Sequence, residues 1–291
     1  MIPSVLVLGG PTAAGKTAAS LEVAERWGAV VLSADAMQVY RGMDVGTAKA
    51  SAEERARVPH FGLDLREPDE PFDAGDFVEL ADQLLAEGRR LVVAGGTSFY
   101  LSALIRGLVR TPPVDQALRA ELEALADPWS ALQAVDPALA ARLHPNDRVR
   151  IVRGLEVFQS GGVRLSELQA AHAAAPDRVR AVGLWLDRDD LDARIDARVE
   201  QMMAQGYLDE VRALMARGYG PSHKPMQSLG YRHLCAHLLG ALPLDAALAL
   251  TRRDTRRFAR KQRTWLRGLG FPRVLPDHLP AALAAGAHAF G

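Results

Sequence analysis

A phosphate-binding loop signature near the amino end constrains this chain more than any other feature. The run Gly10-Pro11-Thr12-Ala13-Ala14-Gly15-Lys16-Thr17 matches the pattern G-x-x-x-x-G-K-[ST] at every fixed position. A buried-strand pattern precedes it at 4–9, and a helical pattern follows at 18–25. Glycines let backbone N–H groups surround an anion, and the helix amino terminus adds positive potential there. The loop predicts binding of a diphosphate-bearing molecule, with Lys16 on the terminal phosphate and the Thr17 hydroxyl on Mg²⁺.

Strand and helix patterns alternate around this loop. We expect strands over 29–34, 90–94 and 180–186, and helices over 77–87 and 98–105. This alternation predicts an α/β fold of the P-loop NTPase type, with a parallel sheet flanked by helices on both faces. Further expected elements are helices at 189–205, 207–217 and within 244–269, and a short strand at 272–276.

The pattern changes in the middle of the chain. Residues 113–177 are rich in Ala, Leu and Arg, show helical segments and lack a convincing strand. We therefore expect a core formed by 1–112 and 178–291, with 113–177 as an inserted all-helical domain.

Bulk composition narrows the function classes. The 291 residues include 35 Lys and Arg against 35 Asp and Glu, so any nucleic-acid site must come from local clustering of charge. A single cysteine, Cys235, excludes an internal disulfide and fits a reducing compartment. No apolar run approaches membrane-spanning length, and we expect no signal peptide. The sequence predicts a cytoplasmic protein without a membrane partner.

Asp35 is a candidate catalytic group. It ends the second predicted strand, near Gln38, Tyr40 and Arg41, where a carboxylate can act as a general base or a metal ligand. The structural alternative is a helix N-cap. The next predicted strand ends in Gly95-Gly96-Thr97 instead of the acidic residue of a Walker B element, which argues against a simple NTPase.

Two further groups could bind anions, although each has a structural alternative that is favoured when it is taken alone. Residues 46–49, Gly-Thr-Ala-Lys, offer N–H groups and an ammonium as a second anion clamp, or form only a turn with a solvated lysine. Arg194 and Arg198 share one helical face and can converge on a phosphate. Alternatively, they pair with acidic residues of the same helix.

The strongest nucleic-acid signal is a basic helix at 252–267. Its basic residues fall within roughly half of the helical wheel, with Asp254 the only acidic residue among them. Phe258, Ala259, Trp265 and Leu266 fall on the opposite side, so we expect these four to pack on the core. The exposed stripe would neutralise a phosphate backbone. The basic residues are Arg252, Arg253, Arg256, Arg257, Arg260, Lys261, Arg263 and Arg267.

These motifs together resemble the bacterial tRNA dimethylallyltransferase family, also called isopentenyl-tRNA transferases. The resemblance rests on the P-loop, the run 33–49, Gly95-Gly96-Thr97, the segment from Leu143 to Arg153, Leu229-Gly230-Tyr231 and the run 260–267. It covers nearly the whole chain. Ala36 and Val149 depart from the family pattern, which often has Ser and Gln at these places.

The resemblance implies a prenyltransferase. It would move a dimethylallyl group from dimethylallyl diphosphate to N6 of the adenosine on the 3′ side of the tRNA anticodon, releasing diphosphate. By this resemblance Asp35 is the base, residues 10–17 hold the diphosphate, and Thr12, Lys16 and either Arg198 or Arg194 assist catalysis. Mg²⁺ is the implied cofactor, with Thr17 as its ligand, and a monomer suffices.

The resemblance also implies a set of tRNA contacts. The target base would leave the stack to reach a buried pocket. The implied contacts are Asp35, Ala36, Met37, Gln38, Thr97, Arg119, Val149, Arg150, Ile151, Val152, Arg153, Met226, Gln227, Ser228, Leu229, Gly230, Tyr231, Arg260, Lys261, Gln262, Arg263, Thr264, Trp265, Leu266 and Arg267.

Two other functions compete with this one. A small-molecule P-loop kinase that binds ATP would explain the first motif and the α/β core, but not the basic helix. A non-catalytic RNA-binding protein would explain the basic helix and leave Asp35 without a role.

Overall fold

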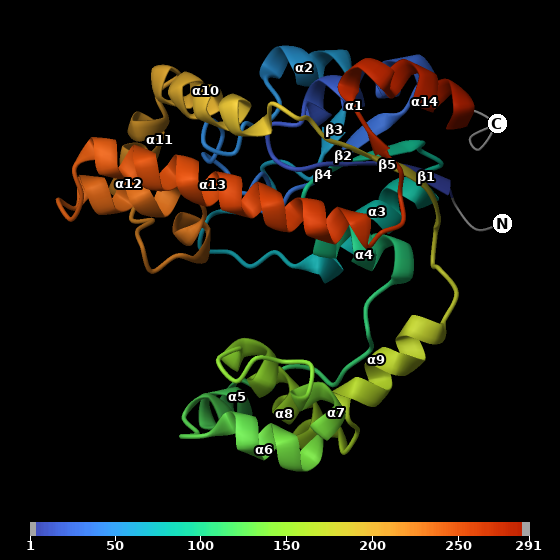
Figure 1. The fold of residues 1–291 in the computed structure, drawn as a ribbon, viewed down its shortest axis with the longest axis vertical. Helices are drawn as coiled ribbons and strands as arrows, with labels where there is room; N and C mark the ends of the chain where they lie inside the picture. Colours follow the sequence, from blue (N-terminus) through green and yellow to red (C-terminus); the bar gives the residue numbers. More distant parts are fainter. Residues whose placement is uncertain (1–3, 287–291) are drawn as a thin grey trace. The chain divides into compact units, whose positions relative to one another are not determined.

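The computed structural model describes residues 4–286 and divides the chain into two compact units (Figure 1). The first unit comprises Met1–Ile105 and Arg178–Gly291, and the second comprises Arg106–Asp177. The second unit thus begins earlier than residue 113. Among residues 4–286 no helix is long and apolar enough to cross a membrane.

The core of the first unit is a parallel six-stranded sheet with the order β3-β2-β4-β1-β5-β6, which confirms the predicted α/β fold. The two-residue strand β3 was not predicted, because two residues carry no periodicity. The strands are β1 (Ser4–Gly9), β2 (Val30–Ala34), β3 (His60–Phe61), β4 (Leu91–Gly95), β5 (Arg180–Leu186) and β6 (Arg273–Val274).

Helices cover both faces of this sheet (Figure 1). Side chains of α1 (Lys16–Trp27) and α14 (Leu279–Gly286) pack against one face, through residues such as Leu21. Side chains of α3 (Ala74–Ala86) and α4 (Ser98–Arg106) pack against the other, through Phe77 and Leu101. Both faces are therefore buried, as a parallel sheet requires.

The strand register brings three loops to one edge of the sheet. Gly95 at the end of β4 pairs with Gly9 of β1 on one side and with Ala34 of β2 on the other. The segments that follow these strands, starting at Gly10, Asp35 and Gly96, therefore leave the sheet side by side. This carboxyl edge is where open α/β sheets bind ligands.

The carboxyl half of the first unit adds a helical layer. Side chains of α11, η1, α12 and α13 share an apolar core with the 37–48 loop, centred on Met43, Tyr207 and Tyr231. Cys235 of α12 is buried in this core, as expected for a small apolar residue. The helices are α2 (Ala52–Arg57), α10 (Leu191–Ala204), α11 (Tyr207–Ala216), η1 (Lys224–Gln227), α12 (Tyr231–Leu238), α13 (Leu244–Arg267) and η2 (Pro276–His278).

The second unit is all helical and has its own apolar core, to which Leu132, Leu139 and Leu155 contribute. Asp115, Asp127 and Asp136 cap helices with their side chains, which explains the Asp and Asp-Pro signals in the sequence. Its helices are α5 (Gln116–Glu123), α6 (Pro128–Val135), α7 (Pro137–Ala140), α8 (Arg148–Gly161) and α9 (Leu165–Ala174).

Several residues that are implied to contact tRNA have partners within this unit. Ile151 and Val152 are buried in its core, so their side chains are not available to a nucleic acid. Arg119 and Arg153 both bind the buried carboxylate of Glu156, at 3.0 and 2.7 Å. They neutralise a charge that would be costly to bury alone. Val149 and Arg150 are the implied contacts on α8 that remain exposed.

Candidate functional site

The P-loop lies between β1 and α1 at the carboxyl edge of the sheet. Gly15 caps α1 with φ 95°, a left-handed conformation that glycine adopts without strain, and Lys16 is the first helical residue. The Lys16 ammonium donates a hydrogen bond to the Pro11 carbonyl at 2.8 Å. Thr12, Gly15, Lys16 and Thr17 line one large cavity, which has an anion-binding helix terminus in its wall.

Positive charge is concentrated in this cavity. Burial and the nearby Arg198 cation lower the pKa of Lys16 to about 8, while the Asp35 carboxylate acts in the opposite direction. Burial also lowers the pKa of Arg198, again opposed by Asp35. Lys16, Arg198 and Asp35 therefore interact electrostatically, although they come from three separate segments. Two cations held this close without a second anion create a strong site for a polyanion.

The structure separates the two arginines that the sequence left as alternatives. Arg194 donates from Nε to the Ala13 carbonyl at 3.2 Å, so its guanidinium is bound to the P-loop backbone. Arg198 is half-buried in the cavity and forms no ion pair among residues 4–286. Pairing of either residue with acids of its own helix, the structural alternative, does not occur. Arg198 is therefore the better candidate for a ligand phosphate.

Asp35 directly follows β2 and is fixed by its own turn. Its Oδ1 accepts the Met37 N–H at 2.9 Å, and no helix begins at this point, so the N-cap alternative is wrong. Thr97 accepts the Ala36 N–H at 3.1 Å and donates its own N–H to the Ala34 carbonyl at 3.0 Å. These bonds join the ends of β2 and β4. Asp35 Oδ2 has no hydrogen-bond partner in the described part of the chain.

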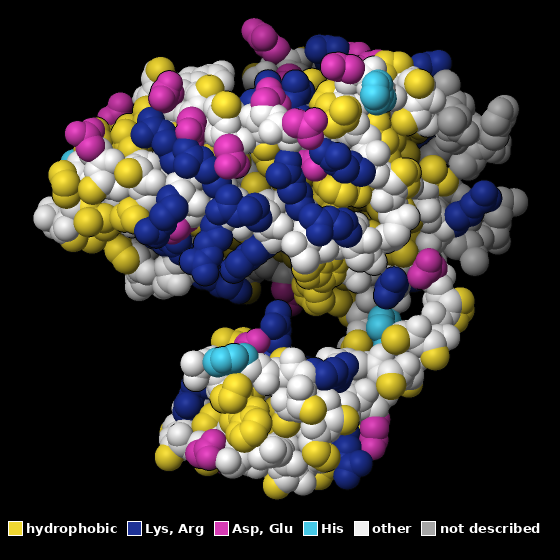
Figure 2. Space-filling view, in the orientation of Figure 1, with side chains coloured by type: hydrophobic (Ala, Val, Ile, Leu, Met, Phe, Trp, Pro, Cys, Tyr) yellow, Lys and Arg dark blue, Asp and Glu magenta, His cyan; other side chains and the backbone are white. Residues whose placement is uncertain are grey.

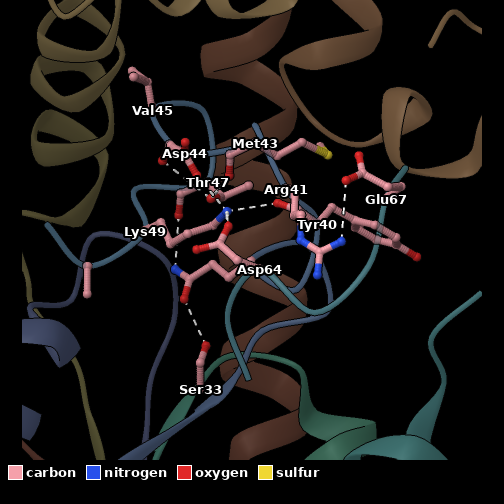
Figure 3. A network of polar contacts seen from close by, with 12 residues as sticks. Ser33, Tyr40, Arg41, Met43, Asp44, Val45, Thr47, Lys49, Asp64 and Glu67 are labelled. Carbon is pink, nitrogen blue, oxygen red and sulfur yellow. Dashed lines mark hydrogen bonds and ion pairs between the residues drawn. The ribbon is translucent and has the colours of Figure 1, made fainter. Parts of the chain in front are cut away.

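The loop after Asp35 is held by an internal polar network (Figure 3). Gln38 accepts from Ser33 at 2.8 Å and donates to the Thr47 carbonyl at 3.1 Å. The oxygen and the nitrogen of its side-chain amide thus both have partners within the chain, whereas the family resemblance implies a contact with the target base. Lys49 is buried and donates to Asp44 and Asp64 at 2.6 and 2.7 Å. It is neither solvated nor part of an anion clamp.

The predicted second anion clamp at residues 46–49 overlaps a turn whose N–H groups bind a carboxylate of the protein itself. The Glu210 carboxylate of α11 accepts the N–H groups of Asp44, Val45 and Gly46 at 2.8, 2.6 and 3.0 Å. The Tyr231 hydroxyl donates to the same carboxylate at 2.6 Å. Sequence reasoning missed Glu210, because nothing in its local pattern indicates a partner 164 residues away.

Gly46 is required for this packing. A side-chain carbon at this position would lie 2.1 Å from the Tyr207 ring. Glu210, Tyr207 and Tyr231 thus hold the 44–46 turn from one side. Residues 35–38 and 44–49 of this segment line the cavity.

Gln262 joins the basic helix to the P-loop. Its Oε1 accepts the Thr12 N–H at 3.0 Å and its Nε2 donates to the Gly96 carbonyl at 3.0 Å. A side chain on Gly96 would collide with this amide, at 2.2 Å from Nε2. Gln262 and Leu266, two of the implied tRNA contacts, are buried, and the Gln262 amide is occupied by these two backbone groups. Phe258 and Trp265 are instead exposed, which corrects our expectation that both pack on the core.

The basic side chains of α13 fall into two groups. Arg252, Arg256 and Arg263 pair with Glu200, Asp196 and Asp187 of neighbouring segments, and Arg253 pairs with Asp254 of α13 itself. Arg257, Arg260, Lys261 and Arg267 are exposed and form no ion pair with any described residue. Figure 2 shows Lys and Arg side chains gathered along the surface that α13 crosses, with acidic side chains near them on one side. Only the second group leaves charge for a partner.

The implied segment 226–231 is also divided. Met226 and Tyr231 are buried in the apolar core of the helical layer. Gly230 is buried against Tyr207, whose hydroxyl oxygen would lie 2.4 Å from a side-chain carbon at this position. Gln227, Ser228 and Leu229 line the cavity. Within residues 226–231, some residues therefore pack in the apolar core, while Gln227, Ser228 and Leu229 remain accessible from the cavity.

The described residues hold no cluster of three or more His, Cys, Asp or Glu side chains that could bind a metal ion. Thr17 lines the cavity at the start of α1. A hydroxyl beside a diphosphate is a donor set that Mg²⁺ accepts, because this ion keeps several waters and takes phosphate oxygens as ligands.

A P-loop at the carboxyl edge of a parallel sheet, with an inserted helical unit, defines a P-loop α/β protein. The sequence profile of the family described as IPP transferase matches residues 38–269. The tRNA dimethylallyltransferase of Geobacter metallireducens is 47% identical, covering 90% of this chain and 89% of that protein. The enzyme of that name from Syntrophobacter fumaroxidans is 49% identical over 91% and 81%.

Solved structures agree. A tRNA isopentenylpyrophosphate transferase from Bacillus halodurans matches with a TM-score of 0.68 and 36% identity, covering 94% of this chain and 90% of that one. A eukaryotic dimethylallyltransferase acting on tRNA matches with a TM-score of 0.79 and 25% identity, covering 91% and 70%. The chain therefore belongs to the tRNA dimethylallyltransferase (IPP transferase) family. It is a prenyltransferase.

Glu210 provides a first test of the site's construction. We expect Glu210→Gln to lower the free energy of unfolding by about 1–3 kcal/mol, because one amide oxygen cannot replace a carboxylate that accepts four hydrogen bonds. Urea unfolding measures this loss, and amide exchange of residues 44–46 should quicken. Asp209→Asn is the matched control, since Asp209 is exposed and, among the described residues, pairs only with Arg212. Equal stability of the two variants would contradict a structural role for Glu210.

Proposed function

We propose that this chain transfers the dimethylallyl group of dimethylallyl diphosphate to N6 of the tRNA adenosine on the 3′ side of the anticodon. The observation that carries the proposal is the juxtaposition of Lys16, Arg198 and Asp35 in one cavity. The cations suit a diphosphate, and the carboxylate suits an incoming amine. In the reaction N6 attacks the allylic carbon, the carbon–oxygen bond breaks with its electrons moving to diphosphate, and the N6 proton passes to Asp35.

The leaving group is the main demand on the site. A departing diphosphate gains negative charge, and donors already positioned around it stabilise that charge. Residues 10–17 supply backbone N–H groups, Lys16 supplies an ammonium, and Arg198 supplies a guanidinium. Arg194 acts on the P-loop backbone through the Ala13 carbonyl, so we assign it a positioning role. Thr17 would hold Mg²⁺ together with diphosphate oxygens, and the ion would add further charge stabilisation.

The acceptor half of the site lies at the end of β2. Asp35 Oδ1 is committed to the Met37 N–H, which leaves Oδ2 to accept the N6 proton. Thr97 orients this turn through the Ala36 N–H. Ala36, Met37 and Thr97 line the same cavity, where an extruded adenine would lie.

The exposed cations of α13 and the accessible residues Gln227, Ser228 and Leu229 would meet the anticodon stem-loop, with Val149 and Arg150 of the helical unit as further contacts. All of these groups come from one copy of the chain, so the proposal needs only a monomer. A tRNA substrate also agrees with the cytoplasmic location expected from the sequence.

The proposal is tested by incubating the protein with labelled dimethylallyl diphosphate and unmodified tRNA, followed by mass spectrometry of the nucleosides. A parallel incubation with labelled ATP tests the kinase alternative. Prenylated adenosine at the position after the anticodon is the expected product. Phosphoryl transfer without prenylation would favour the kinase.

Asp35→Asn tests the base. The substitution keeps an oxygen for the Met37 N–H but removes the proton acceptor, so turnover should fall about 10²- to 10⁴-fold. Affinities for donor and tRNA should stay near those of the wild type. Single-turnover transfer of labelled donor measures the rate, and equilibrium binding measures the affinities. Wild-type turnover in this variant would remove Asp35 from the chemistry and revive the non-catalytic alternative.

Lys16 predicts a pH dependence of donor binding. Its pKa of about 8 means that the ammonium is present below this pH and is lost as the pH rises through it. Donor affinity measured by calorimetry should therefore fall above pH ~8, by at most about tenfold per pH unit. Lys16→Arg keeps the charge and should give a flatter profile. Parallel profiles for the two proteins would exclude Lys16 as the titrating group.

The two groups of cations on α13 predict different salt effects. Arg260→Gln and Lys261→Gln each remove an unpaired charge, so each should reduce the slope of log affinity for tRNA against log salt by about 0.7–0.9. Arg252→Gln is the matched control, since Arg252 pairs with Glu200 and should leave the slope unchanged. Filter binding over a range of salt concentrations measures all three. Equal slopes for every variant would place α13 outside the tRNA interface.

A further inference from the structure

Three large aromatic side chains of the first unit are exposed. Phe99 of α4 is 58% exposed, and Phe258 and Trp265 of α13 are 41% and 44% exposed. All three line the cavity that contains the P-loop and Asp35. None of them makes a ring–ring contact within the described residues, whereas Phe77, Tyr100, Tyr207 and Tyr231 do.

Gln262 joins α13 to the turn before α4, and these two helices carry the three rings. Phe258, Gln262 and Trp265 occupy positions i, i+4 and i+7, so they share one face of α13. Gln262 on this face donates to the Gly96 carbonyl, and Phe99 lies in the first helical turn after Gly96. Thr97 in the same turn accepts the N–H next to Asp35. The three rings therefore line the same cavity as Asp35, on two elements that Gln262 joins.

Cations without partners lie among the rings. Arg257 and Lys261 line the same cavity and form no ion pair with the described residues. Exposed rings interleaved with free cations are the pattern of surfaces that bind single-stranded nucleic acid, because bases stack on the rings and phosphates meet the cations. A hydrocarbon tail of five carbons would need fewer rings, and it would gain nothing from the cations.

We propose that Phe99, Phe258 and Trp265 form an aromatic rim that stacks on the unpaired nucleobases flanking the adenosine when it enters the cavity. The proposal rests on the function proposed above and assigns it a nucleobase subsite. An extruded base leaves its neighbours without a stacking partner on one side, and the rim supplies a replacement. The rim thus lowers the cost of opening the loop and favours substrates whose target lies in a single strand.

The test uses the full chain and an anticodon stem-loop RNA with 2-aminopurine next to the target adenosine. Phe258→Ala and Trp265→Ala should each weaken RNA binding by roughly 5- to 150-fold and abolish the change in 2-aminopurine fluorescence on binding. Phe258→Tyr and Trp265→Phe keep a ring and should retain affinity near that of the wild type. The salt slope of binding should not change in any of these variants, since no charge is removed.

Two controls make the result specific. Leu239→Ala removes an exposed apolar side chain that does not line the cavity, and it should leave RNA binding unchanged. Phe258→Leu keeps apolar volume without a π face and should bind like Phe258→Ala. Tight binding by both Ala variants, or by Phe258→Leu, would overturn the rim. So would a loss of donor affinity in place of RNA affinity, which would mean that the rings cover the hydrocarbon tail.

The outcome is separable from that of the proposed function. If the wild-type protein prenylates the RNA while the Ala variants bind it normally, only the rim is wrong. If the wild-type protein forms no prenylated product, the proposed function fails whatever the binding data show.

Discussion

The amide of Gln262 is the contact on which the arrangement of this site depends. Gln262 binds the N–H of Thr12, which lies 250 positions away in the sequence, and the carbonyl of Gly96, which lies 166 positions away. An amide is suited to this place because it donates and accepts at once, and both partners are backbone groups. These two hydrogen bonds hold the P-loop, the β4–α4 turn and α13 against one another. The proposed donor site and the proposed acceptor surface are therefore held in place by the same side chain.

The strand register explains why one side chain can reach both segments. The parallel sheet aligns Gly9, Ala34 and Gly95 at one edge, so the loops after three strands begin at the same level. Gly96 leaves room for α13 to approach, and a side chain there would collide with Gln262. The sheet register and the absence of a side chain at Gly96 thus allow the P-loop, Asp35 and α13 to meet at one cavity.

Sequence reasoning predicted the elements with strong local signals. The P-loop, β5 and α13 were found because each carries a fixed pattern or a long periodicity, whereas β3 is too short to show either. The helical wheel of α13 was misleading for Phe258 and Trp265. A wheel gives the directions of side chains but not the width of the partner surface, and here the core covers only the strip through Ala259, Gln262 and Leu266.

Site residues were harder to predict for the same physical reason. Arg194 and Arg198 lie on the same helical face, so the sequence alone does not distinguish their roles. In the structure, Arg194 is marked by its hydrogen bond to the Ala13 carbonyl. Glu210 and Gln262 act through partners that are remote in sequence, so no window of residues reveals them. Conversely, Ile151, Val152 and Met226 lie in blocks implied to contact tRNA, yet they are buried. A motif marks a segment, while burial decides which of its side chains are available.

The charge pattern follows from pairing rather than from composition. The chain has equal numbers of acidic and basic residues, so its net charge attracts no polyanion. Arg256 and Lys49 are paired with carboxylates, Arg119 and Arg153 share the carboxylate of Glu156, and the 44–46 N–H groups are occupied by Glu210. Lys16, Arg198, Arg257 and Lys261 keep their charge and line one cavity. Because paired charges largely cancel beyond a Debye length, the field that a polyanion meets is set by this unpaired remainder. A neutral protein can thus direct both a diphosphate and an RNA backbone to the same cavity.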